Sequence, residues 1–205
     1  MSVSLNLLTG KLMNKEKLTP ILILTVVLTL FLTNCTRNAP EVQSDTWEEV
    51  LDRDLHLLGH RNWILVVDKA FPEQSSEGMK YIYVDEGLLP TLGIVLDKVE
   101  KSTHVWPIIY RDLELDYVTE EHAPGIEKFR EESNALLKGR VVNKLLHEDV
   151  FSMLDESSSL FRVLVIKTNG TLPYTSFFLQ LDCAYWGGDQ EEKMRGNLEK
   201  GSQIP

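Results

Sequence analysis

The sequence predicts an α/β fold, a layered domain in which helices flank a largely parallel sheet. Two observations predict it. Short apolar segments rich in β-branched residues alternate with segments whose apolar residues recur at helical spacing, over most of residues 46–186. The chain from Cys35 to Pro205 also has a length that suits one domain. Strands that alternate with helices pack as layers around a sheet whose strands run mostly parallel.

Four segments are predicted to be helices. The first begins at a capping box, Thr46-x-x-Glu49, and ends at Gly59. Its apolar side consists of Trp47, Leu51, Leu55 and Leu58. The second carries Leu92, Val95, Leu96 and Val99, the third follows Pro124 and carries Ile126, Phe129, Leu136 and Leu137, and a short fourth covers 149–154.

Six segments are predicted to be strands: 64–67, 81–84, 105–110, 141–145, 161–166 and 176–181. Pro107 favours an edge or irregular position for the third, because proline cannot donate to a neighbouring strand. Residues 187–205 are polar and contain glycine, which predicts a disordered tail.

The N-terminal region predicts export and lipidation. Lys15 and Lys17 precede an apolar run from Ile21 to Leu32, and Cys35 follows. That run is shorter than the about 20 residues needed to span a bilayer, and it suits a cleavable signal. We therefore expect residues 1–34 to be a bacterial lipoprotein signal, with Met13 as a plausible start. Cys35 is then the lipidated residue, residues 35–45 are a linker, and a lipid anchor holds the domain at a bacterial membrane outside the cytoplasm. An uncleaved signal anchor or an unmodified Cys35 is the alternative.

The net charge bears on binding partners, and the cysteine content bears on disulfide bonds. The formal net charge is −10 and no basic patch occurs, so nucleic acid is not an expected partner. Only Cys183 remains beyond Cys35, so the domain has no intramolecular disulfide. Cys183 lies in an apolar run and is predicted to be a core residue.

The sequence lacks the common signatures of cofactor and metal sites. It contains no phosphate-binding glycine loop and no Gly-x-Ser-x-Gly turn. Its five histidines form no His-Glu-x-x-His zinc motif. We expect neither a cofactor nor a metal.

The segment from Leu58 to Pro72 is the most informative. His60 follows a helix end, an apolar strand comes next, and Asp68 ends that strand. Ligand sites of open α/β sheets lie at the carboxyl ends of strands, where Asp68 is expected. His60 reaches that site only if its loop folds over it. The residues alone leave two alternatives open, a surface histidine at His60 and a turn or cap residue at Asp68.

Gly59-His60, the apolar strand, Asp68 and Pro72 together resemble the D-ribose pyranase / L-fucose mutarotase (RbsD/FucU) family. Three further stretches add to the resemblance: 89–96, which is similar to the start of the family's second helix, His147-Glu148 after a short strand, and Pro173-Tyr174-Thr175-Ser176 after strand 161–166. The order and spacing agree over about residues 47–181. The resemblance implies an RbsD/FucU-like sugar-binding domain over residues 46–186.

The sequence also departs from the family. Ser176 stands where the family usually has asparagine, and Asn169-Gly170-Thr171 replaces a Gly-Glu-Cys stretch. A serine hydroxyl is shorter than an amide and lacks its fork of donor and acceptor, which affects the fit of a substrate. Trp63 is particular to this chain, and core packing is favoured over stacking on a sugar.

The resemblance implies a cofactor-free mutarotase or pyranase, an isomerase acting on free monosaccharides. His60 is then the proton donor, and Asp68 holds a sugar hydroxyl or orients the imidazole. His147, Tyr174 and Ser176 bind hydroxyls. Histidine suits this chemistry because its ordinary pKa of about 6.5 allows it to give and take protons near neutral pH.

The family forms ring-shaped homo-oligomers whose sites are shared between subunits, so His60 and Tyr174 are expected to come from different chains. A non-catalytic monosaccharide-binding or scaffold lipoprotein is the alternative to an enzyme. The departures at Ser176 and 169–171 motivate it.

Overall fold

The computed structural model describes residues 45–201. The predicted signal, Met13 and the predicted lipidation site Cys35 lie outside the described residues. Within 45–201, no helix is both long enough and apolar enough to cross a bilayer.

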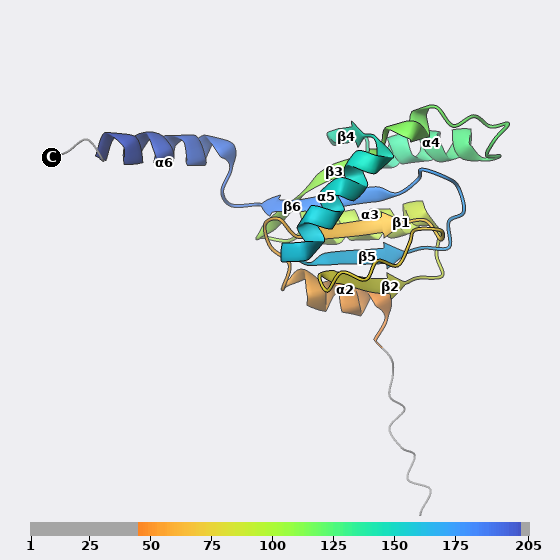
Figure 1. Ribbon diagram of the computed structural model, residues 1–205, viewed down its shortest axis with the longest axis horizontal. Coiled ribbons are helices and arrows are strands. Elements are labelled where there is room, and N and C mark those ends of the chain that lie inside the picture. Colours follow the sequence, from red (N-terminus) through yellow and green to blue (C-terminus); the bar gives the residue numbers. More distant parts are fainter. Residues whose placement is uncertain (1–44, 202–205) are drawn as a thin grey trace, which may run out of the picture. The chain divides into compact units, whose positions relative to one another are not determined.

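Six strands form one mixed sheet, which confirms the predicted α/β fold (Figure 1). Their order across the sheet is β2-β5-β1-β6-β3-β4. Only β6 is antiparallel to its two neighbours, and the other pairs are parallel. The strands are β1 (Trp63–Val67), β2 (Met79–Tyr83), β3 (Val105–Asp112), β4 (Val142–Leu145), β5 (Val163–Lys167) and β6 (Phe177–Cys183).

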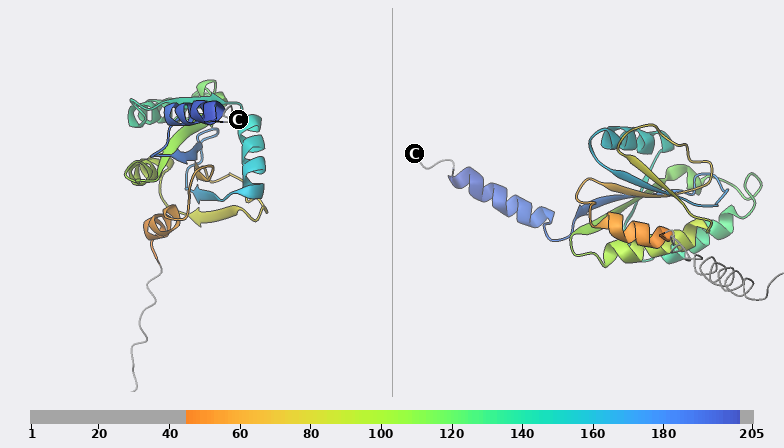
Figure 2. Two further views of the ribbon diagram at one scale, coloured as in Figure 1. Left: turned by 90° about the vertical axis from the view of Figure 1, so that its left-hand side faces the viewer. Right: turned by 90° about the horizontal axis from the view of Figure 1, so that it is seen from below.

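Helices cover both faces of the sheet (Figure 2). One face packs against α2 (Trp47–Leu55), α3 (Leu88–Glu100) and α4 (Ile126–Leu136), and the other packs against α5 (His147–Leu160). A short 3-10 helix, η3 (Leu113–Asp116), follows β3. The capping box predicted at Thr46 is confirmed, because Thr46 Oγ1 accepts from Glu49 N and Glu49 accepts from Thr46 N.

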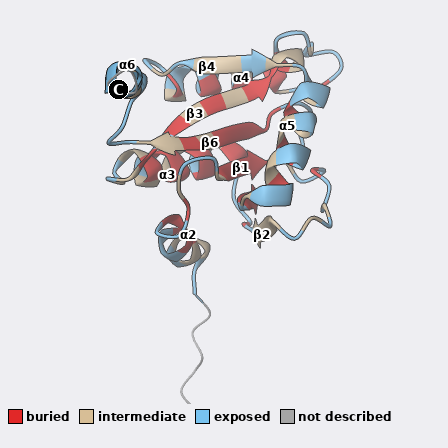
Figure 3. Ribbon diagram, turned by 60° about the vertical axis from the view of Figure 1, so that its left-hand side comes forward, coloured by how far each residue is buried: buried red, intermediate tan, exposed pale blue. Residues whose placement is uncertain are grey.

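The central strands are buried on both faces, as Figure 3 shows. Alternate residues of each strand point to opposite sides. Ile64 and Val66 of β1 join the larger core under α2, α3 and α4, whereas Leu65 and Val67 join the smaller core under α5. The continuous apolar run of β1 therefore reflects burial on both faces.

Although β3 lies between two other strands, Pro107 lies at a local edge of the sheet. β3 pairs with β6 from Val105 to Arg111, but β4 pairs only with Ile109–Asp112. Pro107 therefore has a neighbouring strand on one side only, which is where proline is tolerated.

The C-terminal segment differs from the expected disordered tail. Residues Gly188–Gly201 form helix α6, in which no residue is buried. Local contacts accompany it: Trp186 Nε1 donates to Glu191 at 2.7 Å, and Glu191 pairs with Arg195 one turn later. Pairs of this kind stabilise a helix without a core, and a pattern of apolar residues does not reveal them.

Candidate functional site

Three chain segments meet where β1 and β3 end and β6 begins. Val66 and Arg111 both pair with Phe177, so they lie on opposite sides of β6. One residue further along, the ends of β1 and β3 therefore flank Ser176. Because β1 and β3 run parallel, their carboxyl ends share this edge of the sheet, where ligand sites of α/β folds commonly lie. We call this region the carboxyl-edge site.

Asp68 and Ser176 are joined directly in this site. Ser176 Oγ donates to Asp68 Oδ2 at 3.0 Å, and it accepts the N–H of Asp68 at 3.3 Å. The second carboxylate oxygen, Oδ1, accepts from Ala70 N at 2.8 Å. The carboxylate thus performs the turn-forming role considered from the sequence, and it is also held in one orientation beside the other site residues.

His147 lies in the site as the first residue of α5. The helix therefore begins two residues before the start at 149 that the sequence predicts. The backbone N–H of His147 lies 3.0 and 3.1 Å from the two carboxylate oxygens of Glu114. An acidic group at a helix N-terminus satisfies a donor that has no partner within the helix and interacts favourably with the helix dipole. Glu114, in η3, therefore fixes where α5 begins.

The imidazole of His147 is held on several sides. Its ring lies 4.7 Å from the ring of Phe151 and 5.4 Å, edge to face, from that of Tyr174. Its Nδ1 is buried, 3.2 Å from Oδ2 of Asp112. Among residues 45–201, no hydrogen-bond partner contacts Nε2. His147 thus presents one nitrogen to the protein and the other outward.

Asp112 is the site residue that sequence reasoning missed. Only 1% of it is exposed, and neither carboxylate oxygen has a well-aligned hydrogen-bond donor within the described part of the chain. Burial raises its pKa to about 6. The nearby His147 opposes that increase, while the negative charges of Glu114 and Asp68 add to it. Asp112 is the last residue of β3, and Asp68 directly follows β1, so a position at a strand's carboxyl end was the available signal.

Tyr174 completes the carboxyl-edge site. Its backbone adopts a left-handed conformation with φ of 56°, which is uncommon for a residue other than glycine and marks a conformation imposed by its surroundings. Its ring contacts His147 and is partly exposed. The structure therefore brings together four of the five residues predicted for the sugar site: Asp68, His147, Tyr174 and Ser176.

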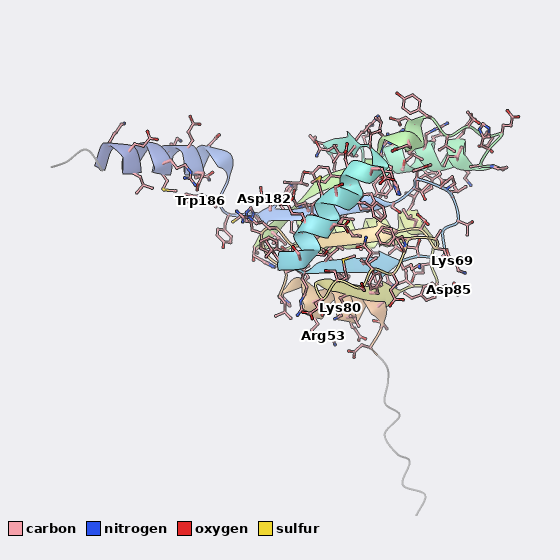
Figure 4. The ribbon with its side chains drawn as sticks, in the orientation of Figure 1. Arg53, Lys69, Lys80, Asp85, Asp182 and Trp186 are labelled. Atoms are coloured by element: carbon pink, nitrogen blue, oxygen red, sulfur yellow. The ribbon has the colours of Figure 1, made fainter. Side chains whose placement is uncertain are left out.

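His60 lies at the other end of the sheet. It precedes β1 whereas Asp68 follows it, and the five residues of β1 span roughly 16 Å. Nδ1 of His60 lies 2.8 Å from Oδ1 of Asp182, at the far end of β6. In Figure 4, Asp182 and Lys69, the neighbour of Asp68, appear at opposite ends of the strands. Asp182, rather than Asp68, therefore orients the imidazole, and the loop of His60 does not fold over the carboxyl-edge site.

A separate cleft of about 570 Å³ lies beside His60. Arg61 Nε lies 3.3 Å from Nε2 of His60, while Nδ1 of the same ring faces Asp182. Trp63 lines the inner wall of the cleft and is buried against Tyr110, which confirms the predicted core role. The remaining lining residues are Met153, Glu156, Ser157, Leu160, Phe161 and Gln180.

Two smaller expectations concern metal binding and Cys183. Over residues 45–201, no group of three or more histidine, cysteine, aspartate or glutamate residues is arranged to hold a metal ion. Cys183 is a free thiol that is half-buried at the end of β6, rather than deep in the core as predicted. Cys183 is the last residue of β6, where the strand is less buried than at its centre.

Comparison with known proteins finds structural similarity only. No protein-family model and no curated protein sequence matches the chain. Bacillus subtilis RbsD in complex with D-ribose is 20% identical, with a TM-score of 0.47 over 67% of this chain and 95% of that chain. The fucose mutarotase of Streptococcus pneumoniae in complex with L-fucose is 19% identical, with a TM-score of 0.42 over 62% and 87%. FucU from Bifidobacterium longum is 16% identical, with a TM-score of 0.42 over 64% and 91%.

Proposed function

We propose that this protein is a cofactor-free monosaccharide mutarotase or pyranase that interconverts anomers or ring forms by histidine-mediated proton transfer. One observation carries the proposal. Asp68, His147, Tyr174 and Ser176 come from three distant parts of the chain and lie together at the carboxyl edge of the sheet. They offer a carboxylate, an imidazole and two hydroxyls, the groups that bind sugar hydroxyls.

The chemistry requires an acid and a base but no redox step. To open the ring, the anomeric hydroxyl loses a proton and the ring oxygen gains one. Rotation about the bond next to the aldehyde and closure of the ring then give the other anomer. Imidazole groups suit both proton transfers near neutral pH.

His60 is assigned to the site of a neighbouring subunit. Within one chain it lies at the opposite end of β1 from Asp68, so one subunit does not assemble all five predicted residues. The His60 side chain is 56% exposed and therefore accessible to a second copy. A ring-shaped homo-oligomer would bring the His60 end of one chain to the carboxyl-edge site of the next.

Saturation-transfer NMR tests the proposed activity. Ribose, fucose and related free sugars are mixed with the wild type or with His60→Ala, and the exchange rate between anomers is measured. The proposal expects at least one sugar to exchange faster with the wild type than with the variant. If none does, the proposed activity fails.

A non-catalytic monosaccharide-binding or scaffold protein is the second candidate. It is favoured by the bond from Ser176 Oγ to Asp68, which engages the hydroxyl that the resemblance assigns to sugar binding. Tight sugar binding, measured by titration calorimetry, without faster exchange would favour this candidate. Rapid exchange would exclude it.

We also propose that Cys35 carries a lipid and holds the domain outside the cytoplasm. The support is the sequence pattern of residues 1–35. Outside the cell the domain would supply a transporter with its preferred anomer. Incorporation of labelled palmitate by the wild type and its loss in Cys35→Ala are expected. Cys35→Ala protein that remains membrane-bound would argue against the anchor without affecting the sugar site.

A further inference from the structure

The buried carboxylate of Asp112 has no structural role that its contacts explain. A buried ionisable group is costly unless it is paired and hydrogen-bonded. Asp112 is 1% exposed, both of its oxygens lack aligned donors, and no arginine or lysine within 45–201 pairs with its carboxylate. Arg111, its neighbour, directs its guanidinium to Asp116 and to the backbone carbonyl of Asp112. Unsatisfied buried polar groups are rare in native proteins and concentrate at functional sites.

Asp112 lies next to the imidazole of His147. The side chain of Asp112 shares its face of the sheet with Tyr110, two residues earlier, which packs under α5. α5 begins at His147, and the imidazole Nδ1 lies 3.2 Å from Asp112 Oδ2. Glu114 holds the backbone of His147, while Phe151 and Tyr174 confine its ring. Three separate contacts therefore hold His147 at this distance from Asp112.

An ionised carboxylate at this place selects one tautomer of the imidazole. In the tautomer that this carboxylate favours, the proton lies on Nδ1 and the lone pair lies on Nε2. Two further carboxylates lie near Asp112, Glu114 from η3 and Asp68 after β1. When Nε2 accepts a proton, the resulting imidazolium lies beside Asp112.

We propose that Asp112 is the positioning residue that makes His147 the base of the carboxyl-edge site. This inference rests on the proposed function, for which the sequence indicates a proton donor, His60, but no acceptor. Nε2 of His147 takes the proton of the anomeric hydroxyl. The oxygen becomes the carbonyl oxygen of the aldehyde as the bond from the anomeric carbon to the ring oxygen breaks.

The electron pair of the broken bond stays on the ring oxygen, which takes a proton from His60 in its imidazolium form. His147 is then an imidazolium whose Nδ1–H faces Asp112. Closure of the ring reverses both transfers: His147 returns its proton to the new anomeric hydroxyl, and His60 regains the proton of the attacking hydroxyl. No proton, electron or co-reactant is consumed over the cycle.

Asp112→Asn tests the proposal, because it keeps the shape of the side chain and removes its charge. Asp52→Asn is the matched control, since Asp52 is an exposed carboxylate paired with Lys98. The first measurement is the ¹⁵N spectrum of the histidine side chains, in which His147→Gln identifies the signals of His147. The wild type and Asp52→Asn should show His147 protonated on Nδ1, whereas Asp112→Asn should lose that single tautomer.

The second measurement is the sugar exchange rate of the full chain between pH 5 and 8. Asp112→Asn should lower it by about 10- to 100-fold at neutral pH, which is part of the roughly 10²- to 10⁴-fold that general acid–base catalysis contributes. An unchanged tautomer, or an unchanged rate in Asp112→Asn with an active wild type, would overturn the inference and leave the proposed function standing. If the wild type exchanges no sugar, the proposed function fails and the assignment of a base fails with it.

Discussion

Ser176 Oγ lies 3.0 Å from Oδ2 of Asp68, in a bond between residues 108 positions apart in the chain. It connects the loop after β1 to the residue before β6. Ser176 is almost fully buried, so its hydroxyl relies on this partner. The bond fixes the orientation of the Asp68 carboxylate.

Replacing Ser176 with alanine should weaken sugar binding. Asp68 loses the hydroxyl that orients it, and one hydrogen bond to a charged group contributes about 1.5–3 kcal/mol. Part of that loss is recovered when water replaces the hydroxyl, so we expect the dissociation constant of the best sugar from the exchange screen to rise roughly tenfold. Titration calorimetry measures it. Ser159→Ala, at an exposed serine of α5, is the control, and equal affinities of the two variants would contradict the role of Ser176.

Asp112→Asn should make the protein more stable at neutral pH. A carboxyl whose pKa is raised by folding contributes stability below its unfolded value, about 3.8, and loses that contribution as the pH rises through about 6. The change from 3.8 to about 6 corresponds to about 3 kcal/mol. The advantage of Asp112→Asn in free energy of unfolding should therefore grow by about 2–3 kcal/mol between pH 3.5 and 7.5.

Chemical denaturation at several pH values measures this difference. Asp52→Asn separates the effect of burial from that of removing one negative charge. An advantage of Asp112→Asn that is the same at pH 3.5 and 7.5 would show that Asp112 is not a costly buried carboxylate.

Mixed assemblies should recover activity if sites are shared between chains. His60→Ala and Tyr174→Phe are each expected to be at least tenfold slower than the wild type when tested alone. After unfolding and refolding as an equal mixture, a site that takes His60 from one chain and Tyr174 from another is complete in about one quarter of cases. The exchange rate should therefore return to about a quarter of the wild-type value. A mixture as inactive as its components would place both residues in the same chain's site or exclude one of them.

Gly78 is expected to tolerate no side chain. A Cβ atom there would overlap the carbonyl oxygens of Ser158 and Phe161, at the end of α5. Gly78→Ala should therefore destabilise the fold by about 1–3 kcal/mol or more, since the opposing atoms are backbone. Gly93→Ala is the matched control within α3, where a Cβ meets only Leu136 Cδ1, at 3.6 Å. The control should be neutral or slightly stabilising, and thermal unfolding distinguishes the two.

Local sequence patterns predicted the elements that are buried. The apolar run of β1 and the spacing in α3 predict their positions, because burial alone imposes those patterns. Tertiary contacts account for what was missed. α5 begins at His147 because Glu114, distant in sequence, accepts its N–H. It continues to Leu160 through the polar stretch 155–159, which a pattern of apolar residues does not reveal. The helical tail α6 depends on polar pairs rather than on an apolar face.

In the carboxyl-edge site, too, local motifs predicted some residues, whereas tertiary contacts account for what was missed. Asp68, His147, Tyr174 and Ser176 were assigned by motif, and the structure places them together. Asp112 was missed because its proximity to the other site residues depends on the strand order, in which β6 lies between β1 and β3. No local sequence pattern reveals that order. The separation of His60 from Asp68 is a consequence of the strand between them, because an extended strand places its two ends far apart.

The most direct test of the carboxyl-edge site is the rate of anomer exchange measured by saturation-transfer NMR for the wild type and three variants. Asp68→Asn and Tyr174→Phe alter the site, whereas Tyr185→Phe alters an exposed tyrosine after β6. The account predicts that the wild type and Tyr185→Phe accelerate the exchange of at least one free monosaccharide equally, and that the two site variants are at least tenfold slower. Acceleration that survives both site variants, or no acceleration of any sugar by the wild type, would contradict it.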